Sequence, residues 1–234
     1  MLESTVVTHG APTLARLKLG SLFSISRDSD FEAELARLNA LFEPKGVVLT
    51  VLREKEGRAL LYLYRERDLE SALRCPRIQA FLKECGYRSF QLENVLAHLR
   101  ERLAASEEFP HEIGIFLGYP LSDVIDFIRN DGQNCLCCGC WKVYSNECEA
   151  LRAFARFRKC KEVYGRQFAS GRPLSQLTVR SRTAYGKEIF HEQGSGGFLE
   201  RHGQHGGNGG GGGPGKFGDA FYRIGVRCWQ GERI

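Results

Sequence analysis

The sequence predicts an α+β fold for residues 1–179, mainly helical around a small antiparallel sheet. Apolar residues recur at helical spacing in several segments, and two β-rich runs flank a polar turn at Glu56-Gly57. From Arg180 onward the chain holds 16 of its 27 glycines and loses this periodicity. We therefore expect a single globular domain at residues 1–179, followed by a disordered Gly-rich tail at residues 180–234.

The N-terminal part is expected to contain two helices and a hairpin. Pro12 can open the first helix, whose apolar positions are Leu14, Leu17 and Leu22. Asp28-Ser29 can cap the second helix, and Ser29 and Glu32 have capping-box spacing. Its apolar positions are Phe31, Leu35, Leu38 and Phe42. Residues 47–52 and 59–64 are then expected to pair as a hairpin.

The C-terminal part of the domain is expected to be mostly helical. Cys75-Pro76 and Cys85-Gly86 bracket a short helix, which a longer helix follows. The apolar stripe of the longer helix is Leu92, Val95, Leu96, Leu99 and Leu103. Two short helices are expected at residues 111–117 and 122–128, and a short strand at residues 141–144. Asn146 can cap a last helix with apolar positions Leu151, Phe154, Phe157 and Val163.

The charge pattern argues against a nucleic-acid partner. Residues 1–179 contain 25 Lys and Arg against 23 Asp and Glu, so most of the net charge of +5 lies in the tail. The signs alternate, as in Arg65-Glu66-Arg67-Asp68, which is typical of a solvated surface. The sequence shows no secretory signal and no membrane span, so we expect a cytoplasmic protein without a membrane partner. Its nine cysteines are then expected to be free, metal-bound or redox-active.

Four thiols lie within six positions, at Cys135, Cys137, Cys138 and Cys140. Residues 135/138 and 137/140 each have C-x-x-C spacing, which can direct two thiolates at a soft metal or at each other. The four are therefore candidate ligands for zinc or an iron–sulfur cluster, and candidates for thiol exchange. Both pairs share one loop, unlike the two separated knuckles of a standard zinc site.

Two further patterns carry potential chemistry. His111-Glu112 places an imidazole beside a carboxylate, although adjacent helical side chains diverge by about 100°. The pair is a candidate catalytic site or, equally, a structural one. Cys138-Gly139-Cys140-Trp141 is similar to the nucleophile segment of papain-like proteases. Those enzymes place their histidine after the cysteine, whereas every histidine of this domain precedes Cys140.

Four groups of residues carry a family resemblance: His9 with residues 11–15, residues 57–60, residues 109–120, and Cys137 with Gly139 and residues 141–144. Through them, residues 1–179 resemble an uncharacterised bacterial family, domain-of-unknown-function family 3793, which is common in anaerobic Gram-positive bacteria. Family members often carry His-Cys in place of His9-Gly10, and tyrosine in place of Cys140. Within this resemblance Cys137 is the first candidate for a reactive thiolate or ligand, with His111 and Glu112 as auxiliary groups. His9, Trp141 and Tyr144 are further candidate site residues.

The tail has a second interpretation, at the level of codons. Read one base later from a CAT codon at His191, residues 191–205 can encode Met-Ser-Lys-Val-Ala-Val-Val-Phe-Trp-Ser-Gly-Thr-Gly-Asn-Thr, which resembles the start of a flavodoxin. The Ser-Gly-Thr-Gly-Asn-Thr string matches a flavin phosphate loop. We interpret residues 180–234 as a frameshift or read-through product that overlaps a flavodoxin gene.

These observations favour three hypotheses. The first is a cysteine-based metal-binding or thiol redox accessory protein that works with flavodoxin. The second is a non-enzymatic binding module, with structural zinc or no metal, in which Trp141 and Tyr144 form part of a binding surface. The third is a cysteine-dependent hydrolase.

Overall fold

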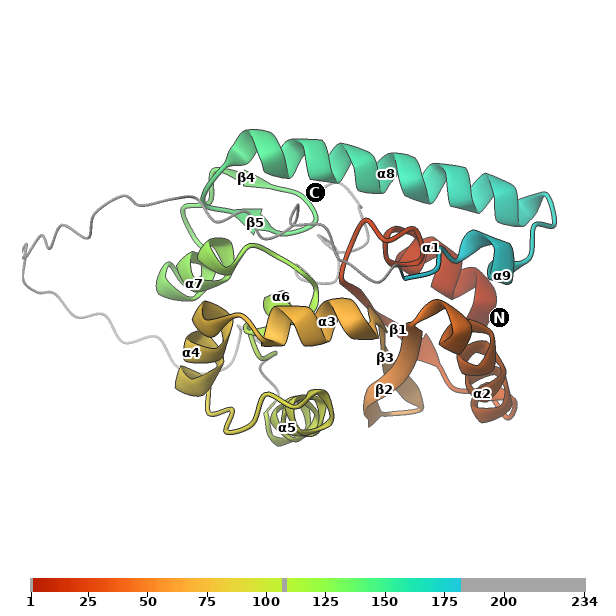
Figure 1. The fold of residues 1–234 in the computed structure, drawn as a ribbon, viewed down its shortest axis with the longest axis horizontal. Coiled ribbons are helices and arrows are strands. Elements are labelled where there is room, and N and C mark those ends of the chain that lie inside the picture. Colours follow the sequence, from red (N-terminus) through yellow and green to blue (C-terminus); the bar gives the residue numbers. More distant parts are fainter. Residues whose placement is uncertain (1, 107–108, 182–234) are drawn as a thin grey trace, which may run out of the picture.

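The computed structural model describes residues 2–106 and 109–181. Three strands form an antiparallel sheet in the order β1-β3-β2, and helices cover both of its faces (Figure 1). The strands are β1 (Gly20–Ser26), β2 (Val47–Lys55) and β3 (Arg58–Arg65). This architecture confirms the predicted α+β fold with a small antiparallel sheet. The predicted tail lies outside the described residues from position 182 onward.

The hairpin of β2 and β3 confirms the predicted pair of strands and extends both. Glu56 and Gly57 connect them with φ values of 52° and 72°. Two consecutive positive φ values match the right-handed twist of paired strands, and glycine adopts this conformation without steric cost. The register shifts by one residue between Val51 and Arg53, which leaves Leu52 as the extra residue of a bulge.

The N-terminal helix differs from the prediction. Helix α1 (Leu2–Leu14) contains Pro12 in its last turn instead of beginning there. Leu22, predicted to be helical, lies on β1 and pairs with Tyr62. Residues of β1 face both cores, since Leu22 packs on one side of the sheet and Phe23 on the other. A strand buried on both faces loses simple alternation, so periodicity alone does not distinguish it from a buried helix.

The core consists of two apolar layers separated by the sheet. On one side pack α1, α2 (Phe31–Phe42) and α9 (Leu174–Leu177). On the other side pack α3 (Glu66–Leu73), α4 (Pro76–Glu84), α5 (Leu92–Ala105), α6 (Ile113–Phe116) and α7 (Leu121–Arg129). The predicted stripe of α5 is confirmed, because Val95, Leu96, Leu99 and Leu103 are buried. Helix α3 was not predicted, and α2 lacks the side-chain capping bonds expected of Ser29 and Glu32.

The run Arg65-Glu66-Arg67-Asp68 was predicted to be solvated, which is wrong for Arg65 and Asp68, whereas Glu66 and Arg67 are exposed. Arg65 is fully buried, and its guanidinium donates hydrogen bonds to the carbonyls of Thr13 (2.8 Å) and Leu14 (2.6 Å). Asp68 is 3% exposed and pairs with Arg16 at 3.4 Å. Arg65 thereby satisfies carbonyls at the C-terminal end of α1 that have no helical partner.

The C-terminal part of the described chain holds a second, two-stranded sheet and the longest helix. Strands β4 (Cys137–Cys138) and β5 (Lys142–Val143) pair antiparallel before α8 (Glu147–Ala169), which lies along α1 at the top of Figure 1. The helix confirms the prediction, although Leu151 is 50% exposed and not a core residue. Contacts continue to Ser181, whose N–H donates to Lys45, two residues past the predicted boundary at 179. Among the described helices, none is both long and apolar enough to cross a bilayer.

Candidate functional site

The cysteine segment forms a β-hairpin over the first half of α8. Its first strand, β4, carries Cys137 and Cys138 as consecutive residues, and consecutive strand residues point to opposite faces. Cys137 accordingly packs with Cys140 and Trp141 against Val143 and Phe154, while Cys138 is exposed. The four thiols are thus divided between the two faces of the hairpin.

Asp123 anchors the hairpin to α7. It is 2% exposed and accepts four hydrogen bonds. One oxygen accepts from the indole N–H of Trp141 at 2.8 Å. The other accepts from the backbone N–H of Tyr144 at 3.0 Å, and from the N–H and hydroxyl of Ser145 at 2.9 Å each. A buried carboxylate with every contact satisfied holds the end of the hairpin in one position.

Trp141 and its neighbours are structural in this arrangement. The indole stacks on Tyr119 at a centroid distance of 5.1 Å and meets the edge of Phe154 at 4.5 Å. A methyl group at Gly139 would lie 2.2 Å from a carbon of Phe154, so only glycine fits there without a shift. Tyr144 is partly buried; its hydroxyl has no hydrogen-bond partner among the described residues, and burial raises its pKa to about 12.

Cys137 is held as a protonated thiol. Burial raises its pKa, and the Glu147 carboxylate, which accepts a hydrogen bond from the thiol, raises it further. The nearby Cys135 and Cys138 act in the same direction. In this conformation Cys137 is therefore a poor nucleophile at neutral pH, since the thiolate is the reactive form.

The hairpin does not bring its thiols together as a preformed metal site. Within residues 2–106 and 109–181, no three His, Cys, Asp or Glu side chains are arranged to hold a metal ion. The cause is the alternation of strand residues, which turns Cys137 and Cys138 apart. Zinc or iron–sulfur binding by Cys135, Cys137, Cys138 and Cys140 would require the hairpin to change conformation.

A small cleft of about 30 Å³ brings together residues from distant parts of the chain, at the place where α1 and α8 meet the hairpin. His9, Lys18, Tyr119, Cys140 and Lys161 all contribute to its lining. The cleft volume suffices for one or two water molecules. The hydroxyl of Tyr119 donates to the backbone carbonyl of Cys140 at 2.9 Å and fixes the loop there. His9 also stacks on Phe23, with ring centroids 5.7 Å apart.

The electrostatics of the cleft are dominated by cations. Burial lowers the pKa of Lys18 to about 8, and Lys161 acts in the same direction. Burial raises the pKa of Cys140, against the opposing effect of Lys18, Lys161 and Arg158. Burial and Lys161 lower the pKa of His9, which favours a neutral imidazole at pH 7. The cleft thus combines a thiol, a neutral imidazole and ammonium groups.

His111 and Glu112 do not share a target. His111 meets the ring of Phe127 edge-on at 5.2 Å. Glu112 is 2% exposed; it pairs with Arg102 at 2.5 Å and accepts a hydrogen bond from the hydroxyl of Tyr87 at 3.2 Å. These contacts give Glu112 a structural role between α5 and α6. They favour the structural interpretation of the His-Glu pair over the catalytic one.

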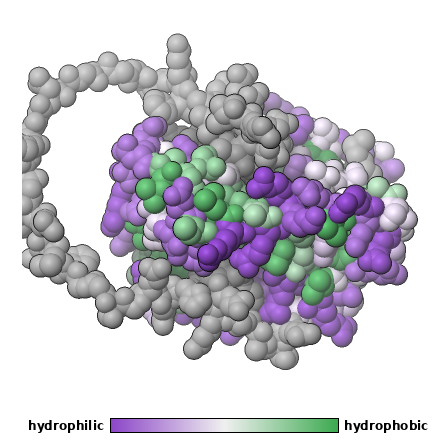
Figure 2. All heavy atoms as spheres, turned by 90° about the horizontal axis from the view of Figure 1, so that it is seen from above, coloured by the Kyte–Doolittle hydropathy of each residue, from purple (hydrophilic) through white to green (hydrophobic). Residues whose placement is uncertain are grey.

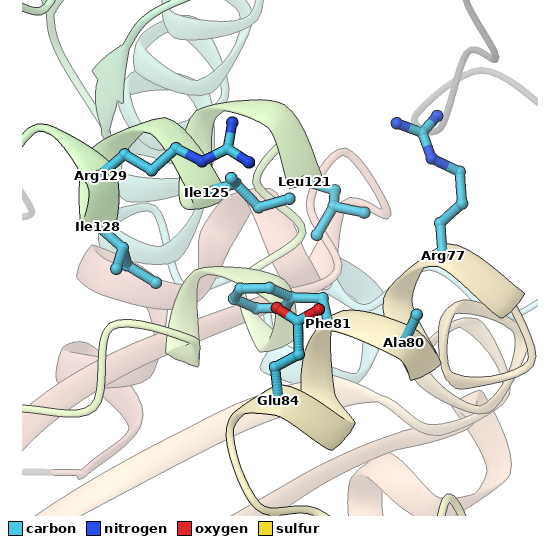
Figure 3. Close-up of a pocket in the computed structure, with 8 residues that line it drawn as sticks. All are labelled: Arg77, Ala80, Phe81, Glu84, Leu121, Ile125, Ile128 and Arg129. Atoms are coloured by element: carbon cyan, nitrogen blue, oxygen red, sulfur yellow. The ribbon is translucent and has the colours of Figure 1, made fainter. Parts of the chain in front are cut away.

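A groove of about 410 Å³ lies between α4 and α7, and no residue of the cysteine hairpin lines it (Figure 3). Figure 3 shows Leu121, Ile125 and Ile128 of α7 opposite Phe81 of α4. Its remaining lining residues are Arg77, Ala80, Glu84 and Arg129. The volume falls within the range of roughly 300–1,000 Å³ that is usual for small-molecule sites.

Two residues important for the site were not predicted from the sequence. Lys18 lies in a stretch without any motif, and only the tertiary structure places it beside Cys140. Asp123 lies in the first turn of α7, where an acidic residue is ordinarily explained by the helix dipole. The following Trp141-Lys142-Val143-Tyr144 segment gives no indication that Asp123 is its anchor.

The fold and the cleft define a small α+β protein with a thiol-bearing cleft under a cysteine-rich hairpin. The family model described as "Protein of unknown function (DUF3793)" matches residues 6–178, so the chain belongs to this family. This match confirms the resemblance found in the sequence. No curated protein and no solved structure matches the chain significantly.

Proposed function

We propose that this protein is a thiol redox accessory protein that reduces a disulfide with Cys140 and Cys137. The observation that supports this function is the cleft, where Cys140 meets Lys18, Lys161 and His9. Nearby cations stabilise a thiolate, and a neutral imidazole can accept the thiol proton. No other cysteine of the described residues combines these neighbours.

The proposed reaction is a thiol–disulfide exchange in two steps. The Cys140 thiolate attacks one sulfur of a disulfide R–S–S–R, forms a mixed disulfide and releases R–S⁻. The Cys137 thiolate then attacks Sγ of Cys140, forms the Cys137–Cys140 disulfide and releases the second R–S⁻. The protein loses two electrons and two protons, and the substrate becomes two thiols. The C-x-x-C spacing and the packing of both cysteines against the cluster of Val143, Ala150 and Phe154 support this pairing.

We assign different roles to the two cysteines from their charged neighbours, since burial raises the pKa of both thiols. Cys137 donates a hydrogen bond to Glu147, whose carboxylate can take its proton when it attacks the mixed disulfide. Cys140 faces the cations and is the attacking thiol. This assignment reverses the ranking drawn from the family resemblance. Because family members often carry tyrosine at position 140, the proposal assigns the chemistry to this chain and to relatives that retain the cysteine.

Flavodoxin is the proposed electron donor. A flavin hydroquinone can reduce the Cys137–Cys140 disulfide by transferring two electrons and two protons, which regenerates both thiols. The support is the possible flavodoxin start in the codons of residues 191–205, which lie outside the described residues. Sequencing the locus tests this part: without an overlapping flavodoxin start at the His191 codon, flavodoxin is removed from the proposal. Cytoplasmic localisation, which would keep the thiols reduced, belongs to the same proposal.

The redox function is tested by oxidising the purified chain with 2-hydroxyethyl disulfide and mapping disulfides by mass spectrometry. We expect a Cys137–Cys140 disulfide, lost in Cys137→Ser and in Cys140→Ser. Cys148→Ser is the matched control, because Cys148 is exposed and lies at the start of α8. If wild-type protein forms mixed disulfides only at exposed cysteines, the proposal is wrong.

A second candidate function is a binding module at the groove between α4 and α7. Its support is the volume of about 410 Å³ and the apolar side chains of Leu121, Ile125 and Ile128 on one wall. The test is a fluorescence titration with 1-anilinonaphthalene-8-sulfonate, an apolar anionic dye. Ile125→Glu should abolish dye binding, whereas Leu151→Glu, an exposed apolar control on α8, should leave it unchanged.

A further inference from the structure

Helix α8, which supplies Arg158 and Lys161 near Cys140, carries an excess of positive charge beyond its first turn. From Arg152 to Arg172 the chain has seven Lys and Arg residues and one acidic residue, Glu162. Residues 1–179 as a whole are nearly balanced, so this segment concentrates positive charge. Hydrophilic residues cover much of the face that carries α8, and a group of hydrophobic residues interrupts them (Figure 2).

Four of these basic residues form a stripe along the exposed side of α8. Arg152, Arg156, Lys159 and Arg166 fall within an arc of about 80°, because an α-helix turns 100° per residue. All four are exposed, and none of them forms a salt bridge with another described residue. The stripe extends over about 21 Å at a rise of 1.5 Å per residue.

Two basic residues of α8 also act on the thiol of Cys140. Arg158 and Lys161 project from the same helix, and both favour the ionised form of Cys140. Lys18 adds a third cation from the loop that follows α1. No acidic residue is among the described residues that line the cleft. The charged residues that line the cleft or act on Cys140 are therefore all cationic.

We infer that the disulfide with which Cys140 exchanges is anionic, with carboxylate or phosphate groups close to its sulfur atoms. This inference rests on the proposed redox function and adds the substrate class. In the exchange, the negative charge of the substrate pairs with Arg158 and Lys161 while the Cys140 thiolate attacks the nearer sulfur. The released thiolate is also an anion, and the same cations stabilise it as it leaves.

The test compares three disulfides of similar length and different charge. They are 3,3′-dithiodipropionate (dianionic), 2-hydroxyethyl disulfide (neutral) and cystamine (dicationic). Cys137→Ser protein retains the mixed disulfide at Cys140, and peptide mass spectrometry measures the rate at each cysteine in the same molecule. At Cys140 we expect the dianionic probe to react roughly tenfold or more faster than the dicationic one at low salt, with the ratio falling as salt rises. Cys148, between Glu147 and Glu149, is the internal comparison and should not share this preference.

Charge reversal at two positions makes the test specific. Arg158→Glu should lower the ratio at Cys140 about threefold or more, whereas Arg166→Glu, the same charge change about 12 Å further along α8, should change it little at 0.1 M salt. Equal rates for the three probes at Cys140, or equal effects of the two variants, would overturn the inference. Circular dichroism of each variant verifies folding, and both positions are exposed. A charge preference without a Cys137–Cys140 disulfide in wild-type protein would refute the redox function and leave the anion preference standing.

Discussion

Substitution of Asp123 tests whether this residue holds the cysteine hairpin in place. Its carboxylate accepts hydrogen bonds from Trp141, Tyr144 and Ser145, and the side chain is almost completely buried. Asp123→Ala removes all four bonds and leaves three N–H donors without this acceptor. Each buried donor without a partner costs about 1–3 kcal/mol, so we expect the free energy of unfolding to fall by about 3–5 kcal/mol.

Asp123→Asn should be milder and more specific. The amide oxygen can replace the carboxylate oxygen that faces Tyr144 and Ser145, but the amide NH₂ then faces the indole N–H of Trp141. One bond is lost and two donors oppose each other, so the expected cost is about 1–3 kcal/mol. In a Trp141→Phe background the indole donor is absent. The cost of Asp123→Asn should then fall, giving a coupling of about 1–2 kcal/mol in the double-mutant cycle.

Urea unfolding, followed by circular dichroism and tryptophan fluorescence, measures these costs. The chain has two tryptophans, so Trp229→Phe isolates the signal of Trp141. The rate of Cys140 with 2-hydroxyethyl disulfide provides a second measurement, because a displaced hairpin changes the surroundings of this thiol. A cost below about 1 kcal/mol for Asp123→Ala, or no coupling with Trp141, would refute the anchoring role.

Three further predictions concern the cleft, the hairpin and the core. Lys18 should be acetylated with a midpoint near pH 8, because burial lowers its pKa from 10.5 to about 8. Between pH 8 and 10.5 the unfolded chain binds more protons than the folded chain, so the contribution of Lys18 to the free energy of unfolding rises with pH. An acetylation midpoint above about pH 10 would contradict the burial of Lys18. Gly139→Ala should cost about 1–3 kcal/mol in urea unfolding, because its methyl would lie 2.2 Å from Phe154. Phe154→Leu should recover part of that loss. Unchanged stability of Gly139→Ala would show that this contact is absent. Arg65→Met should cost about 3 kcal/mol or more, because it removes hydrogen-bond donors from the carbonyls at the end of α1. Arg37→Met, at an exposed ion pair, should cost about 0–1 kcal/mol. Equal costs for the two variants would argue that Arg65 does not stabilise the end of α1.

Local sequence signals predicted the elements whose stability depends on near neighbours. The β2–β3 hairpin follows from two β-rich runs on either side of Glu56-Gly57, and the stripe of α5 follows from leucine spacing. β1 was not predicted, because its residues pack on both sides of the sheet through pairing with β3, more than 30 residues away. Helix α3 was missed because its buried Asp68 and the preceding Arg65 have the appearance of surface charges in sequence. Their burial depends on long-range partners, Arg16 for Asp68 and the end of α1 for Arg65.

The sequence by itself determined the family, the fold class and the density of thiols between Cys135 and Cys140, because these depend on residue type and spacing. Only the tertiary structure decided which thiol meets which charge. Strand alternation separates Cys137 from Cys138, Asp123 fixes the hairpin over α8, and the crossing of α1 and α8 brings His9 and Lys18 to Cys140. Spacing along a chain constrains only near neighbours, whereas part of the polar lining around Cys140 comes from His9 and Lys18, which are more than 100 positions away. For this reason we propose Cys140 as the attacking thiol, whereas the family resemblance alone favoured Cys137.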